Sequence, residues 1–468
     1  MKIHQLYTGC LAEAAYFIVS NGEAAIIDPI RDTEAYLKMA EQHNATIKYI
    51  FETHFHADFV SGHLDLAAKT GATIVYGPQA NPDFEFHQAK DGEEFTIGVV
   101  RLQALHTPGH TLESTTYLLL DEEGEQQAIF TGDTLFIGDV GRPDLAVKSD
   151  LTQADLAGLL YDSLRDKIMP LRDEVMVYPA HGAGSACGKN MSKERYDTLG
   201  NQKKFNYALR KDMTREDFIV EVTSGLNAPP AYFPENVSLN KSGYESLDTI
   251  LKRGCVPLSI DDFMVQMQQA NTIVLDTRKP VAFADSHIPG ALFIGIDGGF
   301  APWVGSVIED INTRILIVCD EDREEEVVTR LARVGYDQAI GYLQGGMATW
   351  LAADNQFSMV TEVAPDEVAA NYALWVDHTI DVRKPGEYSE SHILDVPNLP
   401  LDFIHKNKHD YKPTSTYYLH CAGGYRSMIA ASVLMQYGVD NVINIKGGFG
   451  ELKNTGLPLV KQEMEEAW

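Results

Sequence analysis

Side chains of the kind that bind metals follow one predicted strand after another in the first half of the chain. The stretch ETHFHADFVSGH, residues 52–63, begins directly after the apolar segment TIKYIF and carries two histidines and an aspartate at alternate positions. An apolar strand followed by a histidine or aspartate near a glycine recurs in HTPGHT, FTGDT and YPAHG. Open α/β sheets usually place their ligand sites at strand ends. Six potential ligands predict a metal centre there: His54, His56, Asp58, His110, Asp133 and His181.

Strand and helix signals alternate around these motifs and predict an α/β domain built around sheets. Residues 14–29 indicate two strands joined at Asn21-Gly22, 35–44 a helix, 46–54 a buried strand, and 60–71 a helix closed by Gly71. The pattern continues with strands in 114–121, 126–136 and 175–182 and a helix in 154–169. Residues 225–243 lose periodicity and gather Pro, Asn and Gly, which predicts an irregular connection between domains. The first domain is therefore expected to span residues 1–243.

The second half contains an internal repeat. Asp276-Thr-Arg278 followed by His287 reappears 105 residues later as Asp381-Val-Arg383 followed by His392. The Gly-Gly pair of YLQGGMATW is echoed 102 residues later in NIKGGFGEL. Two copies of one α/β module in tandem are predicted, at residues 244–357 and 358–468.

Composition excludes several classes of partner. Thirty-eight Lys and Arg against 67 Asp and Glu give a formal charge of −29, which repels nucleic acid and anionic lipid surfaces. No apolar run approaches the roughly 20 residues that span a bilayer, and MKIHQLYTG has no signal-peptide pattern. A cytoplasmic protein is expected. Its five cysteines are scattered without paired spacing, so we expect free thiols.

The set HxHxD, GH, GD and AHG resembles the metallo-β-lactamase superfamily over residues 1 to about 240, which implies an αββα sandwich. In two-metal members of that superfamily, the histidine that follows the Asp of HxHxD is a ligand of the second site. This chain has Phe59 at that position. Two histidines and one carboxylate, with the remaining positions open, is the arrangement of non-haem Fe(II) oxygenases, because the vacant positions accept both O₂ and substrate.

Within that superfamily the chain looks like the persulfide dioxygenase branch, which implies one mononuclear Fe(II) held by His54, His110 and Asp133. The resemblance gives His56, Asp58 and His181 the role of orienting the ligands or bound water. A zinc thioesterase of the glyoxalase II kind stays open, because Asp58 and His181 could still support a second zinc.

Two further residues are candidates for substrate binding. In the resembling dioxygenases the arginine of GR, here Arg142 in VGRPDL, lines the substrate site, although a surface or structural arginine is an equal expectation. Cys187 is expected either as an accessory thiol near the mouth of the site or as an unreactive loop cysteine. Relatives that use glutathione carry a tyrosine shortly after the AHG histidine, whereas this chain reads HGAGSACGKN. The carrier thiol therefore stays open between coenzyme A, glutathione and another small thiol.

Residues 414–438 predict a strand, a glycine-rich loop that begins at Cys421, and a helix that begins near Arg426. Backbone N–H groups at a helix N-terminus and a nearby arginine stabilise a thiolate. This segment resembles the active loop of rhodanese sulfurtransferases. The resemblance makes Cys421 the nucleophile that carries sulfur as a persulfide, with Arg426 and Ser427 holding the negative charge.

The middle copy departs from that pattern. Cys319 ends its strand, but Arg323 follows after four residues instead of five, and the loop is Asp320-Glu321-Asp322. Carboxylates around a thiolate oppose its ionisation. We expect the middle copy to be a degenerate rhodanese-like domain that acts as a spacer or as the interface of a homo-oligomer.

Over nearly its full length the chain is similar to persulfide dioxygenase–rhodanese fusions of the sulfide-detoxifying type. The implied reaction converts a persulfide, O₂ and water to thiol and sulfite at iron, and Cys421 forms or consumes thiosulfate. Two other classes remain open. A zinc thioesterase would cleave thioesters without O₂, and a sulfur-binding or redox-sensing protein would be persulfidated at Cys421 without turnover.

Overall fold

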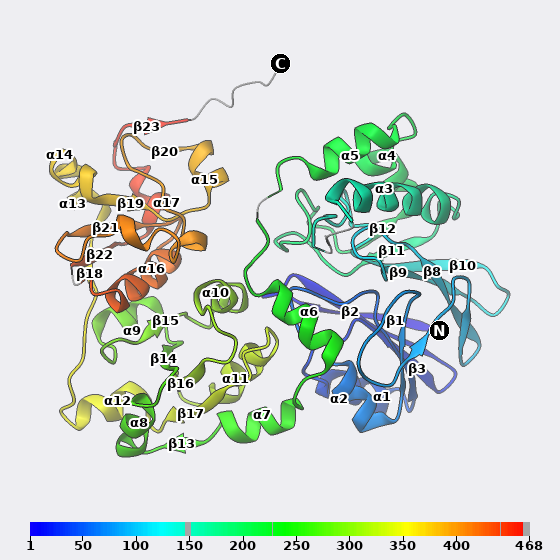
Figure 1. Ribbon diagram of the computed structural model, residues 1–468, viewed down its shortest axis with the longest axis horizontal. Coiled ribbons are helices and arrows are strands. Elements are labelled where there is room, and N and C mark those ends of the chain that lie inside the picture. Colours follow the sequence, from blue (N-terminus) through cyan, green and yellow to red (C-terminus); the bar gives the residue numbers. More distant parts are fainter. Residues whose placement is uncertain (146–150, 227, 440, 462–468) are drawn as a thin grey trace. The chain divides into compact units, whose positions relative to one another are not determined.

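The computed structural model describes residues 1–145, 151–226, 228–439 and 441–461. The chain forms two compact units (Figure 1). Unit 1 comprises Met1–Asp248 together with Ala332–Gly335, and unit 2 comprises Thr249–Leu331 together with Tyr336–Trp468. Residues 462–468, the end of the predicted C-terminal domain, lie outside the described residues.

Two six-stranded sheets form the framework of unit 1. The first has the order β1-β2-β3-β4-β5-β6, antiparallel from β1 to β3 and parallel from β3 to β6. Its strands are β1 Lys2–Thr8, β2 Glu13–Ser20, β3 Glu23–Ile27, β4 Thr46–Phe51, β5 Thr73–Tyr76 and β6 His87–Gln88. The second has the order β12-β11-β10-β9-β8-β7, in which only β10 and β11 are parallel neighbours. Its strands are β7 Glu94–Ile97, β8 Val100–His106, β9 Thr115–Leu120, β10 Gln126–Gly132, β11 Met176–Pro179 and β12 Asp197–Thr198.

Aromatic side chains from both sheets fill the space between them. Tyr16 and Phe51 of the first sheet pack with Tyr117 and Phe130 of the second, and the rings of Phe51 and Tyr117 are 4.8 Å apart. The helices lie on the outer faces of the sheets. They are α1 Glu34–Gln42, α2 His63–Thr70, α3 Gln153–Ser163 with a π turn at Leu164–Ile168, α4 Leu199–Phe205 and α5 Arg215–Thr223. The predicted αββα sandwich is confirmed.

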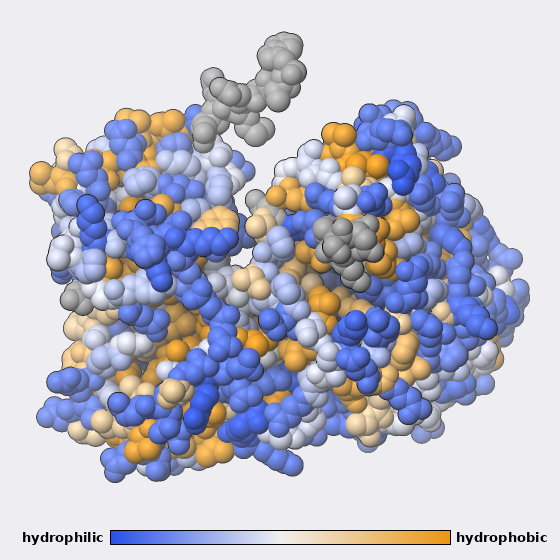
Figure 2. Space-filling view, in the orientation of Figure 1, coloured by the Kyte–Doolittle hydropathy of each residue, from blue (hydrophilic) through white to orange (hydrophobic). Residues whose placement is uncertain are grey.

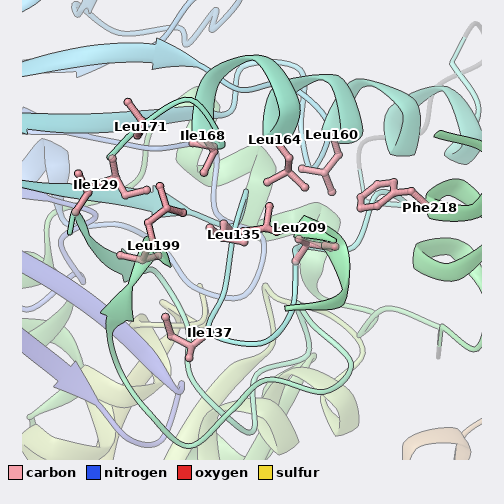
Figure 3. Packing of buried hydrophobic residues seen from close by; sticks show 14 of the residues in the cluster. Ile129, Leu135, Ile137, Leu160, Leu164, Ile168, Leu171, Leu199, Leu209 and Phe218 are labelled. Carbon is pink, nitrogen blue, oxygen red and sulfur yellow. The ribbon is translucent and has the colours of Figure 1, made fainter. Parts of the chain in front are cut away.

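A second apolar cluster lies between the second sheet and helix α3 (Figure 3). Ile129 belongs to β10, and Leu135 and Ile137 follow shortly after Asp133; all three are buried in this cluster with Leu160 of α3. Full burial of one such side chain contributes about 1.5–3 kcal/mol. The loop that carries Asp133 is therefore anchored by core packing on both sides.

Helix α6, Phe233–Ser242, occupies most of the segment that composition predicts to be an irregular connection, so that part of the prediction is wrong. Pro234 lies in its first turn, where a missing N–H costs nothing. Asn236 and Asn240 are poor helix formers, yet both are buried. Asn240 hydrogen-bonds to three backbone groups of residues 56–61, and these tertiary contacts outweigh its low propensity.

Unit 2 contains two parallel sheets, of five and four strands, in which four strands follow the same order. The first, β13-β17-β16-β14-β15, consists of β13 Pro257–Leu258, β14 Thr272–Asp276, β15 Leu292–Phe293, β16 Arg314–Val318 and β17 Ala339–Leu343. The second, β18-β22-β21-β19, consists of β18 Thr361–Val363, β19 Thr379–Asp381, β21 Tyr417–His420 and β22 Val442–Ile445. Strands β20 His392–Ile393 and β23 Leu459–Val460 form a separate antiparallel pair. Because four strands correspond in sequence order and in sheet order, the predicted tandem repeat is confirmed.

Helices cover both sheets of unit 2 (Figure 1). After α7 Leu247–Gly254, the first sheet has α8 Ile260–Met267, α9 Pro280–Asp285, α10 Phe300–Val307, α11 Glu324–Ala332 and α12 Gly346–Ala352. The second has α13 Pro365–Ala370, α14 Tyr372–Trp375, α15 Pro385–Glu390, α16 Tyr425–Gln436 and α17 Gly448–Leu452. We name the β13–β17 sheet with α8 to α12 the middle module, and the β18–β23 strands with α13 to α17 the C-terminal module.

The repeated sequence motif of unit 2 is a buried ion pair that closes a loop. Nη2 of Arg278 lies 2.6 Å from Oδ2 of Asp276 and donates to the carbonyl of Ser286. Arg383 makes the same contacts with Asp381, at 2.6 Å, and with the carbonyl of Ser391. Both copies therefore keep this structural element, and the difference between them lies in the cysteine loops.

Hydrophilic residues cover most of the visible face in Figure 2, and hydrophobic residues form small scattered patches. Among the described residues, no helix combines the length and the apolar character needed to cross a lipid bilayer.

Candidate functional site

Three strand ends of unit 1 bring two histidines and an aspartate together. His54 follows β4, His110 follows β8, and Asp133 follows β10. Their ligand-type atoms lie within 4.8 Å of one another, and all three side chains are buried. Nε2 of His110 is 3.4 Å from Oδ2 of Asp133, and Nε2 of His54 is 3.9 Å from the same oxygen. We call this trio the first cluster.

The other three predicted residues form a second cluster beside the first. His56, Asp58 and His181 also have ligand-type atoms within 4.8 Å of one another. Nε2 of His181 lies 3.4 Å from Oδ2 of Asp58 and 3.5 Å from Oδ1 of Asp133. Asp133 therefore stands between the clusters, with one carboxylate oxygen toward each. Phe59 is fully buried and its ring packs on His56, with centroids 4.3 Å apart.

The polar atoms at this place fit a metal ion. Among the described residues, neither carboxylate oxygen of Asp133 has a hydrogen-bond partner, although both are buried. A buried carboxylate without a partner is costly unless a cation balances it. Burial, with the neighbouring His56 and His110, lowers the pKa of His54 well below its usual range. His54 is therefore neutral, which is the protonation state that binds metals.

Hydrogen bonds fix the two histidines of the first cluster. Nδ1 of His110 donates to the carbonyl oxygen of Arg142 at 2.8 Å, which leaves Nε2 as the acceptor of a neutral ring. Oγ1 of Thr53 lies 2.9 Å from Nδ1 of His54 and donates to Oδ2 of Asp28 at 2.8 Å. Partners of this kind set the tautomer and orientation of a metal ligand.

Buried acids lie behind His56. Its Nε2 is 3.1 Å from Oδ1 of Asp28 and 3.3 Å from Oε2 of Glu52. Burial lowers the pKa of His56, but the two carboxylates outweigh it and raise that pKa well above its usual range. Asn240 donates to the carbonyls of His56 and Phe59, at 2.8 Å each, and holds this loop in place.

Sequence reasoning missed Asp28, Glu52 and Asn240. Asp28 and Glu52 each follow directly after an apolar strand, β3 and β4, which is the same signal that identified the histidines. Asn240 has no local signal, because its partners lie about 180 residues away in the sequence.

Arg142 and Cys187 both lie beside the first cluster. Nε and Nη2 of Arg142 form a two-point ion pair with Asp144, at 2.6 and 2.7 Å, and its backbone N–H donates to the carbonyl of Cys187. The Cys187 thiol is buried within 4.8 Å of ligand atoms of Asp133 and His181. Burial, with Asp58 and Asp133, raises the pKa of Cys187 well above its usual range.

The loop after β21 surrounds the sulfur of Cys421. The backbone N–H of Gly424 donates to Sγ at 3.1 Å, and the hydroxyl of Ser427 lies 3.6 Å away. Gly448 has a positive φ of 55°, and a Cβ there would stand 2.3 Å from the carbonyl oxygen of Cys421. The repeated glycine pair therefore allows the chain to close against the cysteine loop.

Arg426 makes a two-point ion pair with Glu387, with distances of 2.5 and 2.7 Å. Burial works against the charge of Glu387, but the hydrogen bond from Arg426 outweighs it and holds the pKa of this carboxyl below its usual range. Sequence reasoning did not identify Glu387.

The corresponding cysteine of the middle module has a different environment. Burial, then Glu324 and Asp320, raises the pKa of Cys319 to about 12. Arg323 binds the carboxylates of Glu326 and Asp297, at 2.8 Å each. The thiol of Cys319 therefore stays neutral at physiological pH.

Family models match all three parts of the chain. The metallo-beta-lactamase superfamily matches residues 8–181, and the rhodanese-like domain matches twice, at residues 259–353 and 364–455.

Individual relatives match parts of the chain. A cytoplasmic hydroxyacylglutathione hydrolase of Arabidopsis thaliana is 37% identical over 147 residues, which are 30% of this chain and 56% of that protein. The chain thus spans about half the length of that relative. The probable hydroxyacylglutathione hydrolase glo2 of Schizosaccharomyces pombe is 30% identical over 39% of this chain and 75% of its own length.

One solved structure extends beyond the first domain. The crystal structure of a metallo-beta-lactamase from Staphylococcus aureus subsp. aureus COL is 30% identical and covers 74% of this chain and 98% of its own, with a TM-score of 0.63. The chain belongs to the metallo-beta-lactamase superfamily and carries two rhodanese-like domains behind its metallo-beta-lactamase domain.

Proposed function

We propose that the chain is a non-haem Fe(II) persulfide dioxygenase coupled to sulfur transfer at Cys421. The observation that carries the proposal is the first cluster of unit 1. His54, His110 and Asp133 have ligand-type atoms within 4.8 Å of one another, and Phe59 stands where a two-metal enzyme needs a further ligand. Two histidines and one carboxylate leave positions free on a metal for O₂ and substrate.

His54, His110 and Asp133 would hold the iron. The bound iron would supply the chemistry that activates O₂. The carbonyl of Arg142 accepts from Nδ1 of His110 and leaves Nε2 as the nitrogen that faces Asp133, and Thr53 with Asp28 orients His54. His56, Asp58 and His181 would orient the ligands and bound water. Arg142 and Cys187 would border the persulfide. The net reaction is RSSH + O₂ + H₂O → RSH + SO₃²⁻ + 2 H⁺, in which sulfane sulfur is oxidised and O₂ is reduced.

Cys421 would carry sulfane sulfur as a persulfide. Transfer to sulfite breaks the S–S bond and returns the thiolate: Cys421–S–S⁻ + SO₃²⁻ → Cys421–S⁻ + S₂O₃²⁻. The N–H of Gly424 and the hydroxyl of Ser427 face the sulfur and would stabilise the anion in both states. Arg426 would contribute positive charge beside this loop.

A second candidate is a zinc thioesterase of the hydroxyacylglutathione hydrolase type. The names of two relatives favour it, and so does the second cluster, whose His56, Asp58 and His181 have ligand-type atoms close enough to hold an ion. Against it stands the buried ring of Phe59 on His56.

One experiment distinguishes the dioxygenase from the thioesterase. The chain is stripped of metal and then loaded anaerobically with Fe(II) or with Zn(II). Each form is then assayed with coenzyme A persulfide, glutathione persulfide and a hydroxyacylglutathione thioester. The dioxygenase proposal expects O₂ uptake, with sulfite or thiosulfate formed from persulfide, in the Fe(II) form alone. Thioester cleavage in the Zn(II) form, without O₂ uptake and without sulfite or thiosulfate from either form, would favour the hydrolase.

A further inference from the structure

Tyr425 stands at a particular point of the cysteine loop. It is the first residue of α16 and follows directly after Gly424, whose N–H donates to Sγ of Cys421 at 3.1 Å. Any displacement of the Tyr425 backbone therefore changes the contact between the loop and the sulfur.

The side chain of Tyr425 leaves its own module and enters the middle module. Its hydroxyl donates to the carbonyl of Gly295 at 2.6 Å. A Cβ on Gly298 would stand 2.3 Å from Cζ of the tyrosine, so only a glycine leaves room for the ring. The ring of Phe293 meets Tyr425 edge to face, with centroids 6.0 Å apart. We call residues 293–298 the tyrosine socket.

The degenerate cysteine loop of the middle module and the helix α11 that follows it both hold this socket. Arg323, which follows Cys319, donates to Asp297 at 2.8 Å, and Arg330 donates to the carbonyl of Ile296 at 2.7 Å. The backbone of the socket is tied to the end of β14 through Ile294 and Asp276. Arg323 therefore helps to hold the tyrosine socket, which contacts the C-terminal module.

We propose that Tyr425 is a positioning residue, and that the middle module acts through the tyrosine socket to set the geometry of the Cys421 loop. This deepens the proposed sulfur transfer and rests on it. The middle module would then be more than a spacer, since it completes the sulfur-transfer site of its neighbour. Burial, with Asp297, raises the pKa of Tyr425, so its hydroxyl remains a donor over the working pH range.

The first variant changes the socket without touching the C-terminal module, and the second changes Tyr425 itself. In Gly298→Ala the new methyl displaces the ring, and we expect loading of Cys421 with sulfur from thiosulfate to slow by about tenfold. Tyr425→Phe keeps the ring and loses one hydrogen bond, which predicts a loss of about fivefold. Both variants should shift the pH at which iodoacetamide alkylation of Cys421 is half-maximal. A change of stability alone would not shift that pH.

Gln436→Ala is the matched control. Gln436 lies on the same helix and donates to the carbonyl of Gly290 in the middle module at 2.9 Å, but it is eleven residues beyond Tyr425. We expect its sulfur loading to stay within about twofold of the unmodified chain, since its contact is remote from the loop.

A double variant shows whether Tyr425 mediates the effect. In the Tyr425→Ala background, Gly298→Ala should have no further effect on sulfur loading. The proposal is overturned if Gly298→Ala leaves the rate and pH profile unchanged, if Gln436→Ala slows loading equally, or if the two substitutions act additively. Failure of the sulfur-transfer proposal looks different, because Cys421→Ser would then retain transfer.

Discussion

The guanidinium of Arg426 is bound at two points by the carboxylate of Glu387, at 2.5 and 2.7 Å, beside the loop that surrounds the sulfur of Cys421. The resemblance to rhodanese sulfurtransferases predicts that Arg426 helps to hold the negative charge of a persulfide. The structure adds a permanent anionic partner that orients the guanidinium.

The ionised carboxylate of Glu387 makes the stability of the cysteine loop, and with it the rate of sulfur transfer, depend on pH in the acid range. Its pKa is lowered in the folded chain, so the stability that it contributes is complete above its ordinary pKa of 4.5 and is lost as the pH falls through the lower folded value. Glu387→Gln should remove this dependence and slow transfer at neutral pH by about fivefold, because Arg426 loses a charged partner. Transfer rates measured between pH 3 and 8 for both proteins check this. If the transfer rate of the variant falls at low pH in the same way as that of the unmodified chain, protonation of Glu387 is not the cause of that fall.

Asp133→Ala should abolish metal binding at the first cluster and reduce O₂ uptake to background, because one of three ligands is lost. Sulfur loading of Cys421 should remain, since that site uses no metal. Metal content by elemental analysis and loading from thiosulfate are measured on the same preparation. If the variant retains both iron and oxygen uptake, Asp133 is not a metal ligand.

Phe59→His should restore a ligand to the second cluster. Asp133 already has Oδ1 3.5 Å from Nε2 of His181, so a histidine beside Asp58 would complete a second zinc site. Zinc content should rise from about one to about two per chain, while the oxygenase activity of the iron form falls. Equilibrium dialysis measures the stoichiometry. A stoichiometry that stays at one would mean that Phe59 is not what prevents a second metal.

Cys319 should be far less reactive than Cys421. With a pKa raised to about 12, about one Cys319 in ten thousand is ionised at pH 8. Accessibility alone predicts the opposite order, because Cys319 is 8% exposed and Cys421 is 1% exposed. Alkylation at pH 8 followed by peptide mass spectrometry shows which of the two cysteines reacts faster. Faster labelling of Cys319 than of Cys421 would mean that the middle module could also transfer sulfur.

Local patterns in the sequence predicted an α/β domain built around sheets, the tandem repeat and six metal-type residues. The αββα sandwich and the division of those six residues into two sets came from the resemblance to the metallo-β-lactamase superfamily. Apolar strands are visible as runs, and a polar residue directly after a run indicates a strand end. Asp28 and Glu52 carried that signal and were passed over, since neither belongs to a histidine motif.

What the sequence could not predict depends on contacts between distant segments. Glu387 lies 39 residues before Arg426, and nothing in its local sequence marks it as a partner. Helix α6 was missed because its Asn240 is stabilised by hydrogen bonds to the backbone of residues 56–61, and helix propensity does not include such bonds. The tyrosine socket depends on Gly295 and Gly298, which lie 130 and 127 residues before Tyr425.

The central claim is tested most directly by O₂ uptake of the Fe(II)-loaded Cys421→Ser protein with a small-molecule persulfide. In this background sulfite is not converted to thiosulfate by the proposed transfer site. The account predicts rapid uptake, with one O₂ consumed for each sulfite formed. Absence of uptake in protein that holds stoichiometric iron, with either coenzyme A persulfide or glutathione persulfide, would contradict it.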